Sequence, residues 1–259
     1  MSILRPRVPP PRSLARPPEV SSGRRGPPTG FPGPDATGPP LVPHGGGVRH
    51  GGGVHLEPTY PVDTARLVLR PLADTDVDEL LTYRGRADVC RYLPFEPMTR
   101  ETLRARLGAD LSRSAITAEG QALTLGVRVR DTGRLVGDVV LFFRSQEHAR
   151  GEIGYAFHPD VAGRGYASEA CSALLGLGFD QLGLHRVIAR LDSRNEASAR
   201  LAARLGMRRE AHFVRSEMAK GEWVDQLVFA MLAEEWPGSA AHRVQQRGRG
   251  TAPGRATDG

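Results

Sequence analysis

Two glycines that flank a single arginine, Gly163 and Gly165, stand directly before a helical sequence and are placed to bind an anion. Glycine lets the backbone turn tightly and leaves no Cβ to obstruct a ligand. The free N–H groups at the start of the following helix, together with the helix dipole, favour an anion such as a pyrophosphate. Arg164 would add a cationic contact. The segment therefore predicts an anion-binding loop, with a simple tight turn as the alternative.

Two common phosphate-binding loops do not match this segment. A Rossmann loop would carry a third glycine where Ser168 stands, and the strands before it would form a parallel unit, whereas here they form a predicted hairpin. A Walker loop would need Gly-Lys-Ser or Gly-Lys-Thr, and the sequence contains neither. The segment is therefore predicted to be neither a Rossmann loop nor a Walker loop.

The periodicity of apolar residues places this loop in one α+β domain. The predicted elements are a strand over 65–70, helices over 76–84 and 100–115, strands over 122–130, 135–144 and 151–157, a helix over 167–182, a strand over 185–191, a helix over 196–205, and strands over 208–218 and 226–232. Asp74 or Thr75 is expected to cap the first helix, Thr99 the second, and Gly206 to end the last. This order predicts one mixed sheet with a ligand crevice near its centre.

The composition divides the chain into three parts. Fifteen of the 21 prolines precede Val62, and residues 1–61 carry seven Arg against three acidic residues. Residues 237–259 carry four Arg against one Asp. The whole chain has a net charge of +6, so residues 62–236 have a net charge of about −1. Both ends have too few apolar residues to offset the entropy of ordering, and we expect them to be disordered. A basic tail can bind nucleic acid, and a solvated extension is the plainer alternative.

Several function classes are disfavoured by the residues present. Cys90 and Cys171 lie in dissimilar contexts and suggest neither a disulfide framework nor a metal site. No segment has the apolar length of a membrane span or a signal peptide. We therefore expect a cytoplasmic protein with no metal and no membrane partner.

The central region resembles the GNAT N-acetyltransferases, in particular their RimJ/RimL-like branch. The matching segments are Arg66 to Pro71, His158-Pro159, Gly163 to Ala170, His185-Arg186-Val187, then Asn195, Ser198, Arg200 and Leu205-Gly206-Met207, and finally Glu217, Gly221, Trp223, Asp225 and Phe229-Ala230. Asp160 departs from the wider family, which often has Gln or Arg at that position. The resemblance covers Thr64 to about Trp236 and implies a GNAT-like, mixed, mostly antiparallel sheet flanked by helices.

The resemblance implies that acetyl-CoA is the co-substrate and lies where the strand ending near His158 splays from the strand beginning at His185. Backbone amides of the glycine loop would hold the pyrophosphate, and the preceding strand would bind the pantetheine arm. The residues implied in cofactor binding are Phe157, His158, Gly163, Arg164, Gly165, Tyr166, Ala167 and Asn195.

The resemblance also implies catalytic roles. Glu217 would be the base, Ser198 the hydroxyl near the sulfur, and Glu152 a second candidate base. The tyrosine acid common in the family falls at Ala202, so another group must protonate the thiolate. Each residue also has a structural alternative: a solvated charge for Glu217, local backbone bonding for Ser198, a structural strand residue for Glu152, and an N-cap for Asn195.

Four apolar or aromatic residues are candidates for the wall of an amine pocket: Tyr92, Leu93, Phe95 and Trp223. Such residues more often belong to a core, which is the alternative for all four. The sequence thus predicts transfer of an acetyl group to a primary amine, either a protein α-amine or a small molecule, by a monomer or homodimer. The alternative is a module that senses acyl-CoA or docks on ribosomal RNA without turnover.

Overall fold

One mixed sheet organises the protein. The computed structural model describes residues 55–250, with side chains through residue 246. Within that range eight strands follow the order β1-β2-β3-β4-β5-β6-β8-β7, and only the β5–β6 pair is parallel. The strands are β1 (Val62–Asp63), β2 (Leu67–Pro71), β3 (Ala122–Val129), β4 (Leu135–Ser145), β5 (Arg150–Phe157), β6 (Arg186–Asp192), β7 (Arg208–Ala219) and β8 (Glu222–Leu232). The expected α+β architecture is confirmed.

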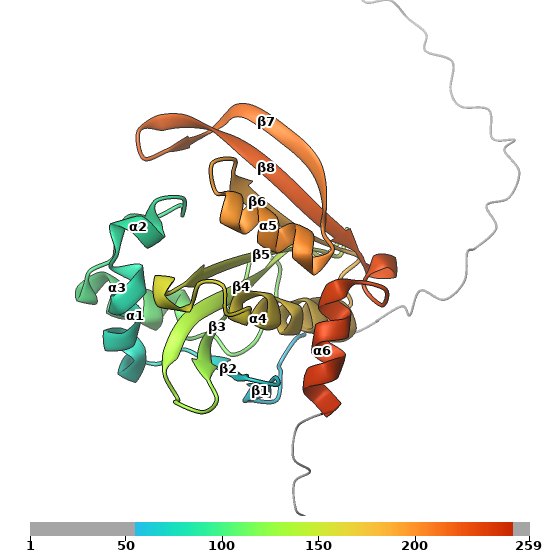
Figure 1. Ribbon diagram of the computed structural model, residues 1–259, viewed down its shortest axis with the longest axis horizontal. Helices are drawn as coiled ribbons and strands as arrows, with labels where there is room; N and C mark the ends of the chain where they lie inside the picture. The colour runs from blue at the N-terminus through green and yellow to red at the C-terminus, as the bar shows by residue number, and fades with distance from the viewer. Residues whose placement is uncertain (1–54, 251–259) are drawn as a thin grey trace, which may run out of the picture. The chain divides into compact units, whose positions relative to one another are not determined.

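Helices cover both faces of this sheet (Figure 1). They are α1 (Val77–Arg84), α2 (Ala87–Cys90), α3 (Arg100–Arg106), α4 (Tyr166–Gly176), α5 (Glu196–Leu205) and α6 (Ala240–Gly250). Apolar residues of α4 and α5 share one core with the sheet, whereas those of α1 and α3 form a second core on the other face. Both faces of the central strands are therefore covered, which explains the nearly continuous burial along β3 and β4. None of the described helices is long and apolar enough to cross a lipid bilayer.

The expected helix ends are confirmed at two of three positions. The Thr99 hydroxyl accepts the Thr102 N–H at 3.2 Å at the start of α3, and Gly206 ends α5 in the left-handed region at φ 94°. Neither Asp74 nor Thr75 caps α1. They belong instead to a 3₁₀ turn (Asp74–Asp76), in which the Asp76 carboxylate accepts the Ala73 N–H at 2.9 Å.

The expectation of disorder over 237–259 is wrong for residues 240–250, which form α6 against α4 (Figure 1). Trp236 anchors this helix: its indole N–H donates to Asp180 at 2.7 Å, and its ring stacks on Phe179 with centroids 5.6 Å apart. Ala241 at the start of α6 is buried. A single apolar face is therefore enough to order a segment whose composition is mostly polar and small.

The fold also begins earlier than residue 62. Leu56 is buried in the larger core and forms an isolated bridge with Ile116. The disorder predicted for residues 1–54 and 251–259 lies outside the described residues, as do most of the basic positions on which contact with nucleic acid was predicted.

Candidate active site

The central feature of the site is a split between β5 and β6. The two strands pair over only three positions, the last of which joins Glu152 to Ile188. Beyond it β5 stays paired with β4 up to Phe157, and β6 stays paired with β8 up to Asp192. The edge of β5 from 153 to 157 therefore faces β6 without a strand partner, and its peptide groups are available to an extended ligand.

The glycine loop follows β5 and leads into α4. Gly163 and Gly165 have φ of 77° and 78°, in the left-handed region where glycine is favoured. The α4 N-terminus has no side-chain cap, and within the described residues the N–H groups of Tyr166, Ala167 and Ser168 have no hydrogen-bond acceptor. Three unsatisfied donors at a helix N-terminus are available to an anionic ligand.

The Arg164 side chain is exposed beside these amides. No carboxylate within residues 55–246 pairs with it. Arg164 is therefore available to an anionic ligand at the same place as the free N–H groups.

A brace that the sequence reasoning missed holds this loop from behind. The buried Glu169 carboxylate accepts the Arg66 backbone N–H and the Arg66 Nε, each at 2.7 Å. Arg66 Nη1 also donates to the Arg164 carbonyl at 2.9 Å, and its guanidinium lies 4.9 Å from the Tyr166 ring centroid. Both residues stand in the segments that match the GNAT pattern, but only their contacts reveal their role.

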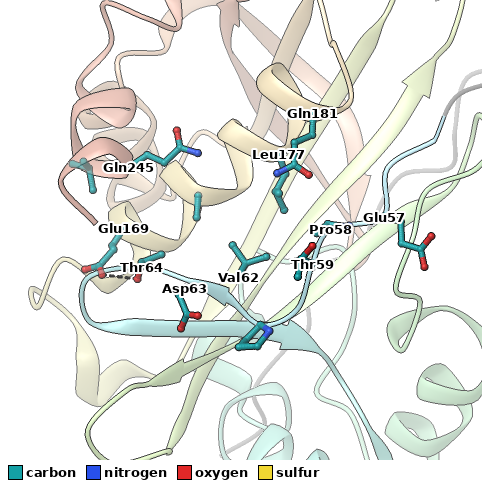
Figure 2. A pocket seen from close by; sticks show the side chains of 13 residues that line it. Glu57, Pro58, Thr59, Val62, Asp63, Thr64, Glu169, Leu177, Gln181 and Gln245 are labelled. Carbon is teal, nitrogen blue, oxygen red and sulfur yellow. Dashed lines mark hydrogen bonds between the residues drawn. The ribbon is translucent and has the colours of Figure 1, made fainter. Parts of the chain in front are cut away.

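Thr64 completes the brace. Figure 2 shows its hydroxyl directed at Glu169 across a groove between the N-terminal segment and α4, and the hydrogen bond is 2.7 Å long. Because Glu169 lies in the first turn of α4, these bonds fix the helix start on which the free N–H groups depend.

The end of β5 is locked by packing and by a local turn. The Phe157 ring lies over Gly137 so closely that a Cβ there would come within 2.4 Å of the ring. His158 is buried, and its Nδ1 accepts the Asp160 N–H at 3.2 Å. The imidazole is thus engaged with its own turn, and the backbone of this segment, more than the ring, faces the split.

The start of α5 lies across the split. Asn195 caps this helix, since its Oδ1 accepts the Ser198 N–H at 3.1 Å. The Tyr155 hydroxyl on β5 donates to the Ser198 carbonyl at 3.2 Å and so joins the two sides. Burial raises the pKa of Tyr155 above its ordinary value. The sequence analysis did not single out Tyr155. The one signal that could have identified it is its place on the strand that precedes the glycine loop.

Beside the split lies a cavity of about 480 Å³ that brings most of the other predicted residues together. One wall comes from 91–96 and includes Tyr92, Leu93 and Phe95; the other comes from β7 and β8 and includes Glu217. Glu152 and Leu191 line the end next to the split. We call this cavity the acceptor pocket, after the role that we propose for it.

Two predicted residues lie outside the acceptor pocket. Trp223 does not line it: this residue is 60% exposed and pairs across the β7–β8 hairpin with Met218, which is 54% exposed and does line the pocket. Ser198 also does not line it and lies at the start of α5 instead. Val224, the next residue along β8, does line the pocket.

The two candidate bases differ in their surroundings. Glu152 Oε2 lies 3.0 Å from Arg144 Nε and 3.6 Å from Arg190 Nη2. Glu217 has no cationic partner within the described residues and accepts only a 3.3 Å hydrogen bond from Gln226. The Glu152 carboxylate is thus held by two guanidinium groups, whereas the Glu217 carboxylate is free to contact a ligand in the pocket.

A bulge in β7 sets the position of Glu217. The strand gains two residues between Phe213 and Glu217, and Arg215 within the bulge has φ 48°. Asp225 on β8 holds the bulge. Its carboxylate accepts a hydrogen bond from the Arg215 N–H at 2.9 Å, and its Oδ2 is hydrogen-bonded to His212 Nε2 at 2.8 Å. These two hydrogen bonds lower the pKa of Asp225 below its ordinary value.

The two walls of the acceptor pocket are tied together at the tip of the hairpin, which lies beside α2 (Figure 1). Lys220 Nζ donates to the Cys90 carbonyl at 2.6 Å. The Arg194 guanidinium lies 5.7 Å from the Tyr92 ring centroid and pairs with Glu222 at 2.6 Å. The pocket is thus built from segments far apart in the sequence.

Known proteins are similar to this chain in sequence. Residues 66–208 match the family model described as "Acetyltransferase (GNAT) domain". The chain is 33% identical over 175 residues to "Uncharacterized N-acetyltransferase YnaD" of Bacillus subtilis (strain 168), which covers 68% of this chain and 98% of that protein. It is 32% identical over 175 residues to "Uncharacterized N-acetyltransferase p20" of Bacillus licheniformis, with 68% and 97% covered.

Among solved structures, the chain is similar to an acetyltransferase of the GNAT family from Bacillus anthracis. The TM-score is 0.60 at 32% identity, over 66% of this chain and 98% of that one. The region matched by the family model, residues 66–208, contains the glycine loop, the split and the 91–96 wall of the acceptor pocket. The chain therefore belongs to the GNAT family and is an N-acetyltransferase.

Proposed function

We propose that this N-acetyltransferase binds acetyl-CoA in the β5–β6 split and transfers the acetyl group to a primary amine held in the acceptor pocket. The observation that carries the proposal is the set of free N–H groups of Tyr166, Ala167 and Ser168 at the end of the split. They suit a pyrophosphate, and Arg164 adds charge. The open edge of β5 suits a pantetheine arm, whose amides can pair with the strand as a further chain would.

Direct attack on the thioester is favoured by the state of the two cysteines. Cys90 and Cys171 are both free and fully buried, and burial raises the pKa of each thiol. A thiol acts as a nucleophile only as the thiolate. Neither cysteine is therefore suited to carry the acetyl group as a covalent intermediate.

The acceptor amine must lose a proton before it can attack. A backbone α-amine has an ordinary pKa of about 8 and a lysine amine about 10.4, so a base matters more for the second. Glu217 is placed to take that proton, because its carboxylate lines the pocket and has no cationic partner among the described residues. Ser198 would supply the hydroxyl near the departing sulfur, and Tyr155 would hold the turn that carries it.

The acceptor that we favour is the α-amine of a protein, in line with the resemblance to the RimJ/RimL-like branch. The acceptor pocket supports this choice because it offers carboxylates, arginines and apolar walls side by side. A peptide presents an amine, polar backbone groups and side chains in the same way. A small-molecule amine is the alternative acceptor.

The test is an acceptor screen on the purified full chain. Acetyl-CoA is mixed with peptides bearing free α-amines, with the same peptides blocked at the N-terminus but carrying lysine, and with small diamines, and thiol release is followed. We expect release with the free α-amine peptides and little with the blocked ones. Binding of acetyl-CoA without release by any amine would favour a sensing role and contradict the proposal.

A further inference from the structure

The acceptor pocket already contains a primary amine that belongs to the protein. Of the 35 lysine and arginine residues of the chain, only Lys220 is a lysine. It occupies the turn between β7 and β8 with φ 51°, and it lines the acceptor pocket together with Glu217, three residues earlier. Its side chain is only 25% exposed.

Contacts with the opposite wall hold this amine in place. Lys220 Nζ donates to the Cys90 carbonyl at 2.6 Å and lies 3.7 Å from a Glu96 carboxylate oxygen. The same cavity extends to Glu152 and Leu191 at the split, so that no wall separates the amine from the place proposed for the thioester. The other cations of the pocket are Arg91, Arg144 and Arg190, whose guanidinium groups stay protonated and do not accept acyl groups.

We propose that Lys220 is a self-acetylation site, modified by the active site of its own chain. The inference rests on the proposed function, since it uses the same donor and the same pocket. After Nζ loses one proton, its lone pair attacks the thioester carbonyl. The N–C bond forms as the C–S bond breaks, a second amine proton is lost, and the thiolate leaves with a proton as free CoA.

Acetylation of Lys220 alters the pocket. The amide has no charge and one N–H in place of the three donors of the ammonium group. It therefore loses the attraction to Glu96 and replaces a charge-assisted hydrogen bond to Cys90 with a neutral one, which is about half as strong. We expect the hairpin tip to be held less firmly against the 91–96 wall, and the pocket to admit acceptors differently.

The single lysine makes the experiment direct. The full chain is incubated with acetyl-CoA without an acceptor, and intact mass and peptide mass are followed over time. We expect a gain of one acetyl group on the peptide containing Lys220 in the wild type and none in Lys220→Arg, which keeps the charge and the donors. Glu217→Gln should slow the gain by about 10²-fold or more, the usual contribution of general base catalysis. A wild-type chain isolated with Lys220 already acetylated, beside an unmodified Glu217→Gln chain, would equally support the proposal.

Three outcomes overturn the proposal. Equal acetylation of Lys220 in wild type, in Glu217→Gln and in urea-unfolded chain would show uncatalysed chemistry. A rate constant that rises in proportion to protein concentration would show transfer between molecules. Acetylation of peptide amines without acetylation of Lys220 would refute self-acetylation but not the proposed function. If neither the peptides nor Lys220 were acetylated, the proposed function would be refuted as well.

Discussion

Arg66 and Glu169 form an ion pair with a 2.7 Å separation between Nη2 and Oε2, and this pair fastens the segment before β2 to the first turn of α4. Glu169 is buried, whereas Arg66 is half exposed. The pair lies behind the free N–H groups of the glycine loop and holds them in place. Its effect on the protein is therefore expected in ligand affinity as well as in stability.

Glu169→Gln should weaken acetyl-CoA binding and lower the free energy of unfolding. The buried carboxylate accepts hydrogen bonds from Thr64 and Arg66, and loss of charge-assisted bonds costs about 1.5–3 kcal/mol. Calorimetric titration with acetyl-CoA and thermal unfolding measure the two effects. Asp110→Asn, which breaks the exposed Arg106–Asp110 pair, is the matched control and should change stability by less than about 1 kcal/mol. Unchanged affinity in Glu169→Gln would show that the brace is not needed for binding.

Gly163→Ala should impair acetyl-CoA binding through the backbone. A Cβ at Gly163 meets no atom within 4 Å, so the penalty comes from its φ of 77° and amounts to about 1–2 kcal/mol. Gly133→Ala is the control, because Gly133 has φ 67° and the same free space in the β3–β4 turn. Both variants should lose similar stability in denaturant titrations. Only Gly163→Ala should lose acetyl-CoA affinity, and equal losses in both would refute a specific role for the loop.

Tyr155→Phe should lower kcat while the fold is kept. The variant removes the hydroxyl that donates to the Ser198 carbonyl across the split and costs about 1 kcal/mol of stability. Tyr60→Phe removes a comparable hydrogen bond, from the Tyr60 hydroxyl to the Ser114 carbonyl, away from the split. We expect the two variants to unfold alike but only Tyr155→Phe to show reduced kcat in steady-state assays. A normal kcat would limit Tyr155 to a structural role.

Glu217→Gln should lower kcat/KM most at low pH, where a larger fraction of the acceptor amine is protonated and needs a base. The expected loss is about 10²-fold or more, the usual contribution of general base catalysis. A pH–rate profile with one α-amine peptide measures it. Glu152→Gln is the comparison: it leaves Arg144 and Arg190 without their shared carboxylate and should act mainly on stability. A profile of unchanged shape in Glu217→Gln would remove Glu217 as the base.

Asp76 should contribute stability that disappears in acid. Burial alone would raise the pKa of this carboxyl, but hydrogen bonds from Arg70, Ala73 N–H and Arg128 outweigh burial and lower it. A group whose folded pKa is depressed stabilises the native state above its unfolded pKa of about 3.9, and this stability is lost as pH falls through the folded value. Asp76→Asn should therefore reduce the difference in melting temperature between neutral pH and acid below pH 4. An identical difference in both proteins would contradict this assignment.

Local patterns in the sequence were enough for the central elements and for the glycine loop. Gly163 and Gly165 before an apolar helix predict a left-handed turn with free N–H groups, because these properties depend on neighbouring residues only. The Thr99 and Gly206 helix ends follow for the same reason. The failure at α6 has a tertiary cause: the polar composition after Pro237 concealed this helix, whose order comes from contacts with α4.

The acceptor pocket depends on relations that a single sequence does not reveal. A two-residue bulge held by Asp225 places Glu217, and Trp223 stays outside the pocket although its cross-strand partner Met218 lines it. The link from Lys220 to Cys90 spans 130 residues, and that from Arg66 to Glu169 spans 103. The sequence by itself determined the elements and the glycine turn before α4, since both follow from near-neighbour sterics and periodicity. Only the tertiary structure decided which charges are free and which are paired, because that depends on which distant side chains folding brings within a few ångströms of each other.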